Sequence, residues 1–184
     1  MGWDVAWTVP EAVIRLKRLR LRRLYDHTLE WIDLTHKHHT DAELVEMIDH
    51  MLACPNVITH VWLCGNRLTD ETGVRLARFV AASTTIEYLD LRDNQFGEET
   101  YLAIAAALHA NSSLRILYLY GNQAVNPTRV EAAFVEALRL NTDRPFRCEW
   151  WLYSMDNDFD RLQRAADALG PPSMLSQLRH YDRT

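Results

Sequence analysis

ITHVWLCGN at Ile58–Asn66, IEYLDLRDN at Ile86–Asn94 and LRILYLYGN at Leu114–Asn122 follow one pattern, LxxLxLxxN, in which L is any aliphatic residue. The three copies begin at residues 58, 86 and 114, so they repeat every 28 residues. A weaker copy, LEWIDLTHK at Leu29–Lys37, begins 29 residues before the first of them. Self-similarity at a constant period of this length indicates a repeat protein, in which one supersecondary unit stacks on the next.

Each copy has the pattern of a strand that is followed by a turn and a helix. In LxxLxL the aliphatic side chains face one way, and the side chains between them face the other. A segment rich in Ala and Leu comes next; in the clearest, Glu98–His109, Leu102, Ala105 and Leu108 share one helical face. The asparagine that closes the motif lies where the chain bends. We expect its amide to satisfy buried backbone groups of the turn.

With these motifs, residues 29–143 resemble the ribonuclease-inhibitor class of leucine-rich-repeat (LRR) proteins. The resemblance implies an α/β LRR solenoid, a short right-handed βα horseshoe arc of about four repeats. A parallel sheet would line its concave side and helices its convex side. The resemblance also implies a non-enzymatic module that binds other proteins, as an adaptor or assembly subunit, without a cofactor or a small-molecule substrate. The repeats would span residues 29–57, 58–85, 86–113 and 114–143.

Residues 1–28 are predicted to form a basic helical cap before the first repeat. The sequence TVPE at Thr8–Glu11 has the form of a helix capping box, with proline in the first turn where it is tolerated. An alternative stays open, because Leu16, Leu19 and Leu21 also fit LxxLxL and could form a short capping strand.

Residues 144–184 are predicted to form a C-terminal cap and tail. A final strand is expected within residues 146–152, and a helix at residues 156–169 that Gly170 stops. Such a cap would shield the edge of the last repeat, which otherwise favours association.

If the strands stack in parallel, the side chains that point away from the helices form columns on the concave face. The third, fifth and seventh motif positions give Trp31, His60, Tyr88 and Ile116, then Asp33, Trp62, Asp90 and Tyr118, then Thr35, Cys64, Arg92 and Tyr120. Clustered aromatic residues with arginine are typical of protein-binding surfaces. The predicted partner-binding residues are Trp31, Asp33, His60, Trp62, Tyr88, Asp90, Arg92, Tyr118 and Tyr120.

Two interpretations of this aromatic cluster remain open. In the first, the tryptophans and tyrosines anchor a partner, and the aspartates and the arginine set its polarity and register. In the second, the rings only support one another along the sheet, or the protein's own tail covers them.

The N-terminal segment offers an alternative function. The chain has a net charge of -5, whereas residues 1–26 contain six basic and three acidic side chains. Arg15, Arg18 and Arg22 share one helical face, which could contact a nucleic acid or an anionic membrane in a ribonucleoprotein or membrane-associated complex. No aromatic residues alternate with these arginines, so pairing with acidic groups of the first repeat, or simple solvation, is the plainer interpretation.

Catalytic and metal-binding patterns are weak. The histidines of residues 36–39 lie on a tight turn, where adjacent side chains diverge, and the acidic run at residues 156–167 has Arg161 where a calcium loop needs glycine. His60 and Cys64 share one side of a strand but lie about 13 Å apart, too far for proton transfer. We therefore expect no catalytic residue and no bound metal.

Composition indicates one globular domain, with 184 residues of which 48% are hydrophobic. Three cysteines form no CxxC pair and leave one thiol unpaired, which favours a reducing compartment. The sequence shows neither a secretory signal nor an apolar run of about 18 residues. We expect an intracellular, cytoplasmic protein.

Overall fold

The computed structural model describes residues 8–14, 30–53, 55–141, 149–153 and 158–170, in which strands alternate with helices. Residues 9–14 are helical and precede the first strand. The elements that follow are β1 (Glu30–Asp33), α2 (Asp41–Ala53), β2 (Ile58–Trp62), α3 (Asp70–Ala82), β3 (Tyr88–Asp90), α4 (Glu98–Ala107), β4 (Ile116–Tyr118), α5 (Pro127–Leu140), β5 (Glu149–Trp151) and α6 (Phe159–Leu169).

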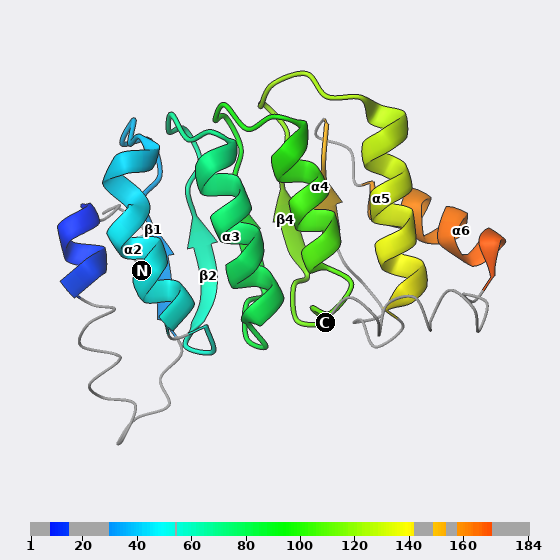
Figure 1. Cartoon of the computed structure of the whole chain (residues 1–184), viewed down its shortest axis with the longest axis horizontal. Helices are drawn as coiled ribbons and strands as arrows, with labels where there is room; N and C mark the ends of the chain where they lie inside the picture. The colour runs from blue at the N-terminus through cyan, green and yellow to red at the C-terminus, as the bar shows by residue number, and fades with distance from the viewer. Residues whose placement is uncertain (1–7, 15–29, 54, 142–148, 154–157, 171–184) are drawn as a thin grey trace, which may run out of the picture.

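The five strands form one parallel sheet in the order in which they follow one another along the chain. Helices α2 to α5 cover one face of this sheet, and α6 lies beyond α5 (Figure 1). Each of these helices packs on the next, so every unit contacts its immediate neighbours. The predicted α/β fold with a parallel sheet is confirmed, whereas the horseshoe curvature stays a prediction.

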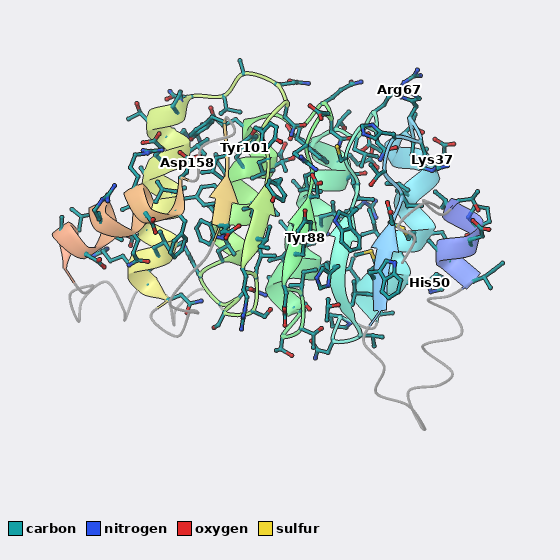
Figure 2. The ribbon with its side chains drawn as sticks, turned by 180° about the vertical axis from the view of Figure 1, so that it is seen from behind. Lys37, His50, Arg67, Tyr88, Tyr101 and Asp158 are labelled. Atoms are coloured by element: carbon teal, nitrogen blue, oxygen red, sulfur yellow. The ribbon has the colours of Figure 1, made fainter. Side chains whose placement is uncertain are left out.

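The opposite face of the sheet carries no helix in the described part of the chain, and we call it the open face. Figure 2 shows the molecule from this side, with Tyr88 labelled near the middle of the sheet. The side chains of the third, fifth and seventh motif positions belong to this face.

The aliphatic motif positions form the core between the sheet and the helices. In the repeat that contains β3, the side chains of Ile86, Leu89 and Leu91 are fully buried. The corresponding side chains of the neighbouring repeats are buried in the same way. Burial of apolar surface stabilises the folded state by about 25 cal/mol per Å². One unit cannot bury its apolar face alone, so it is stable only when it packs against the next unit.

Helix α4 buries a face that differs in part from the prediction. Ala105 and Leu108 are fully buried as expected, but Leu102 is only partly buried, and Tyr101 takes the inward position. The Tyr101 hydroxyl group donates its proton to the carbonyl oxygen of Leu119 at 2.7 Å, and the carbonyl oxygen of Leu152 is a second acceptor within reach at 3.1 Å. A tyrosine is suited to this place because its ring fills the core while its polar end reaches two backbone acceptors.

The motif asparagines join consecutive repeats. Nδ2 of Asn94 donates to the carbonyl oxygens of Leu63 and Leu91, at 2.9 Å and 3.2 Å, and Oδ1 accepts from the backbone N–H of Leu68 at 3.2 Å. Asn66 and Asn122 make equivalent bonds one repeat earlier and one repeat later. The predicted role of these amides is confirmed, and each one also links two neighbouring turns.

Both described ends agree with parts of the predicted caps. Backbone N–H and Oγ1 of Thr8 contact Oε2 of Glu11 at 2.7 Å and 2.8 Å, as a capping box requires. The alternative capping strand at residues 16–21 lies outside the described residues. At the other end α6 begins at Phe159, three residues later than expected, and stops at Gly170, whose φ of 70° suits glycine.

Candidate functional site

The strand register brings the predicted columns together on the open face. Trp31 pairs with His60, His60 with Tyr88, and Tyr88 with Ile116. Along the next column Asp33 pairs with Trp62, Trp62 with Asp90, and Asp90 with Tyr118. Residues that are 28 or 29 positions apart in the sequence are therefore direct neighbours across the sheet.

The aromatic side chains of these columns form a continuous stack from β2 to Tyr120, two residues after β4. The ring of Trp62 lies 5.3 Å from the rings of both His60 and Tyr88, measured between centroids. Tyr88 in turn contacts Tyr118 at 5.6 Å, and Tyr118 meets the edge of Tyr120 at 6.3 Å. These spacings are those of attractive aromatic pairs, so each ring fixes the position of the next.

Arg92 extends this stack with a positive charge. Its guanidinium carbon lies 4.7 Å from the centre of the Tyr118 ring and 5.5 Å from that of Tyr120. Nε and Nη2 donate to the two carboxylate oxygens of Asp90, at 2.8 Å and 2.6 Å, while Nη1 donates to the Tyr120 hydroxyl at 2.9 Å. The hydrogen bonds to Asp90 are the main reason why the pKa of Arg92 lies above its ordinary value, so the guanidinium stays charged.

Exposure differs among the predicted binding residues. Trp31 is 47% exposed, whereas Trp62, Tyr88, Tyr118 and the other stacked rings are partly buried. Burial raises the pKa of Tyr88 and lowers that of His60, with an opposing contribution from the charge of Glu87 at His60. The rings therefore present neutral, apolar edges at physiological pH.

Asp90 has a different place from the one expected of a contact residue. Its side chain is only 1% exposed, and both of its oxygens accept hydrogen bonds from Arg92. Asp90 therefore orients the arginine from below, and the guanidinium is the part of the pair that reaches the surface.

Asp33 occupies the same column but stays accessible. Its Oδ1 accepts hydrogen bonds from the backbone N–H of Thr35 at 3.0 Å and from the Thr35 hydroxyl at 2.7 Å. The carboxylates of Glu87, Asp93 and Glu149 are exposed around the stack. Arg115 is exposed as well, and the Arg92 guanidinium is 31% exposed, so both signs of charge occur on this face.

Strand β5 extends the open face beyond the predicted columns. In the backbone register, Glu149 pairs with Ile116 and Trp151 pairs with Tyr118, so the strand continues the register of the third and fifth motif positions. Neither residue follows from the repeat pattern, because the last strand lacks the LxxLxLxxN motif. The alternation around Trp150, which is fully buried, was the available signal.

The sequence offers two other groups of candidate residues, the N-terminal arginines and the histidines of residues 36–39. Arg15, Arg18 and Arg22 fall outside the described residues. His36 and His38 are exposed on a turn with positive φ angles, and among the described residues no three His, Cys, Asp or Glu side chains gather as a metal site would require. Within the same residues, no helix is long and apolar enough to cross a bilayer.

Comparison with known proteins shows which solved structures share this fold. No family model and no curated protein matches this chain. Among solved structures, it is similar to actin-binding site 2 of leiomodin-1, with a TM-score of 0.68 and 18% identity over 96% of this chain and 99% of that one. It is also similar to a tropomodulin C-terminal domain from Caenorhabditis elegans, with a TM-score of 0.68 and 16% identity over 96% of this chain and all of that one.

These similarities correct the assignment to the ribonuclease-inhibitor class, which was wrong. The chain has the LRR-like fold of the tropomodulin and leiomodin domains. The motif describes only the strand and the turn of a repeat, and these alone did not identify the class. The similarity to these two domains covers 96% of the chain, and the motif region covers much less.

Proposed function

We propose that this chain is a non-enzymatic protein-binding module that acts inside the cell, and that its partner docks on the open face. The observation that supports this proposal most strongly is the continuous stack from His60 to Tyr120, with Arg92 fixed upon it. Tryptophan, tyrosine and arginine contribute most of the binding free energy at protein interfaces.

The stack is also suited to binding because it is already ordered. Association costs about 0.5–1.5 kcal/mol for each side chain that it immobilises. The ring contacts of Tyr88 with His60, Trp62 and Tyr118, and the hydrogen bonds of Arg92, restrict these side chains before a partner arrives. Less of the contact energy is then lost to ordering.

Actin is the first partner to test. A solved structure that shares this fold is an actin-binding site of leiomodin-1, over nearly the whole length of both chains. Because a shared fold does not determine a shared partner, the side chains of the open face have to decide the question.

The experiment compares three forms of the protein. The wild-type chain, the double variant Trp62→Ala with Tyr118→Ala, and the control Leu169→Ala are each immobilised at equal density. Leu169 is a suitable control because it is the most exposed large apolar side chain of the described residues, at 65%, and it lies on α6. Retained proteins from the source cells are quantified by mass spectrometry, and purified actin is titrated separately.

The proposal predicts that at least one partner is retained by the wild type and the control and is reduced more than tenfold in the double variant. Circular dichroism verifies that all three forms are folded. Equal retention by the double variant and the wild type would contradict the proposal.

A matched variant examines the alternative at the N-terminal segment. If the partner docks on the stack from His60 to Tyr120, changing Arg15, Arg18 and Arg22 to Glu should leave the same partner bound. Loss of the partner in this variant, with retention in the aromatic variant, would instead support docking through the arginines. That binding should also weaken steeply with added salt.

A further inference from the structure

Arg92 carries more hydrogen-bond donors than the described residues use. A guanidinium has five N–H groups and no acceptor. Nε and Nη2 donate to the two carboxylate oxygens of Asp90, and Nη1 donates to the hydroxyl oxygen of Tyr120, which accounts for three of them. The second N–H of Nη1 and the second N–H of Nη2 have no acceptor among the described residues. Because Asp90 occupies the edge that Nε and Nη2 form, the second N–H of Nη2 points to the far end of the guanidinium, beside Nη1.

The hydroxyl group of Tyr120 adds a third donor at this end. Its oxygen accepts from Nη1 of Arg92 at 2.9 Å, while its own proton has no acceptor among the described residues. The guanidinium carbon lies 4.7 Å from the centre of the Tyr118 ring and 5.5 Å from that of Tyr120, so the two rings also fix the arginine. Two N–H groups and one O–H group are therefore available at the end of Arg92 that meets Tyr120.

These donors are open to solvent and held in place. The side chain of Arg92 is 31% exposed and Tyr120 is partly exposed, whereas the Asp90 carboxylate is 1% exposed. Oδ1 of Asp90 also accepts from the backbone N–H of Arg92 at 3.1 Å, so one buried carboxylate receives three hydrogen bonds from this residue. A guanidinium that is already ordered loses less side-chain entropy when a ligand binds.

Among the four repeats, only this one has a cation at the seventh motif position. The corresponding residues of the other repeats are Thr35, Cys64 and Tyr120. The unused donors therefore mark one point on the open face and do not recur along it. A contact at such a point can determine how a partner lies on the stack.

Donors without acceptors are complementary to an anion, and the charges nearby favour an anion with a single negative charge. Asp90 already neutralises Arg92, and the exposed Asp93 follows Arg92 directly in the chain. These carboxylates would repel a dianionic phosphate more strongly than a monoanion. A carboxylate fits better, because its two oxygens accept parallel hydrogen bonds from the end of a guanidinium.

We propose that Arg92 and Tyr120 bind a carboxylate of the protein partner, which an aspartate or glutamate side chain of that partner supplies. This inference rests on the proposed function and specifies one contact of the partner on the open face. The carboxylate accepts from the unused N–H groups of Nη1 and Nη2 and from the Tyr120 hydroxyl, while apolar groups of the partner contact the stack.

Propanoate, which carries the carboxylate of a glutamate side chain, tests this site without knowledge of the partner. Sodium propanoate is titrated into the ¹⁵N-labelled full chain near neutral pH and at constant ionic strength. The Nε–H signal of Arg92 and the backbone N–H signal of Tyr120 are followed by NMR. Propanamide, which has nearly the same shape without the charge, and phosphate are titrated in the same way.

We expect a saturable shift of both signals with propanoate and a dissociation constant of about 10–100 mM, as a few charge-assisted hydrogen bonds would give. Propanamide should give no saturable shift, and phosphate should bind no more tightly than propanoate. Equal shifts with propanoate and propanamide, or tighter binding of phosphate, would overturn the inference.

A double variant removes the guanidinium without changing the net charge. In Asp90→Asn with Arg92→Gln both members of the pair are neutral, so no uncompensated charge stays buried. Propanoate binding, followed at the N–H of Tyr120, should weaken at least about tenfold. Tyr120→Phe keeps the ring and removes one donor, so it should weaken binding about threefold.

Arg115→Gln is the matched control, because it removes an exposed cation near the stack and leaves Arg92 unchanged. Propanoate should bind this variant within about twofold of wild type, since the proposed contact is directed and not a general attraction. The dispersion of the backbone signals verifies that each variant is folded. Unchanged binding in the double variant or in Tyr120→Phe, or an equal loss in Arg115→Gln and the double variant, would contradict the proposal.

The outcome is separable from that of the proposed function. If Trp62→Ala with Tyr118→Ala loses the partner but propanoate does not bind wild type, protein binding by the open face stands and the carboxylate site is refuted. If Trp62→Ala with Tyr118→Ala keeps the partner, the proposed function fails, and the partner contact at Arg92 fails with it.

Discussion

The Nη2 atom of Arg92 donates to Oδ2 of Asp90 at 2.6 Å, and the carboxylate that receives this bond is only 1% exposed. A charge buried to this degree is stable only when a partner compensates it. The pair therefore contributes to the fold of the open face and also holds the arginine at its surface.

Replacing Arg92 by Ala should lower the free energy of unfolding by about 2 kcal/mol, because the Asp90 carboxylate would stay buried without its cation. Arg129→Ala is the matched control: Arg129 approaches Glu98 at the same 2.6 Å, but its side chain is 67% exposed. An exposed pair of this kind contributes less than about 1 kcal/mol. Urea denaturation of both variants measures the difference, and equal losses would show that the burial of Asp90 has no effect.

Replacing Asn94 by Ala should cost about 3 kcal/mol. The change leaves the buried carbonyl oxygens of Leu63 and Leu91 and the N–H of Leu68 without this partner, and each such loss is expensive. Asn56→Ala serves as the control, since the exposed Asn56 accepts one bond from Thr84 and should cost less than about 1 kcal/mol. Thermal and urea unfolding would provide both values. A loss of stability in Asn94→Ala no larger than that in Asn56→Ala would contradict the structural role of the motif asparagines.

His60 should make stability depend on pH below neutrality. Burial lowers the pKa of His60 from its ordinary value of 6.5, and the charge of Glu87 opposes this only in part. As the pH falls through 6.5, the unfolded chain takes up a proton that the folded chain resists, so the free energy of unfolding decreases. Between pH 7.5 and pH 5.5 the free energy of unfolding should decrease less in His60→Gln than in wild type, and equal decreases in the two proteins would contradict this prediction.

The thiol of Cys64 should be nearly inert at neutral pH. Burial, and after it the charge of Asp90, raise the pKa of Cys64 to about 12, and the side chain is 4% exposed. Alkylation requires the thiolate, which is scarce under these conditions. The test uses a chain that carries Cys54→Ser and Cys148→Ser. Iodoacetamide at pH 8 should alkylate Cys64 in the native protein more than a hundredfold more slowly than in protein unfolded by guanidinium chloride. Comparable rates would mean that this position is open to solvent.

Sequence periodicity was sufficient to predict the strands, the hydrogen-bonding role of the motif asparagines and the columns of the open face. These features repeat every 28 residues, so their neighbours in space follow from the spacing alone. The class of the protein was predicted wrongly because the motif describes only the repeating strand and turn. The ends depend on elements such as β5, which follow no motif.

The burial of Asp90 could not be deduced from its place in a column either. Asp33 and Asp90 have the same motif position, yet one is accessible and the other is 1% exposed. The difference comes from the residue two places later, since Arg92 covers Asp90 and Thr35 does not cover Asp33 to the same degree. Side-chain partners of this kind depend on three-dimensional packing, which the repeat pattern does not encode.

The role of the open face is tested most directly by photo-crosslinking at two matched positions. Benzoylphenylalanine replaces Tyr118 on the open face in one form of the protein, and the exposed Ala132 on α5 in the other. After irradiation with the captured partner, adducts should form from position 118 and be absent from position 132. Adducts from position 132 alone, or equal yields from both positions, would contradict docking on the aromatic face.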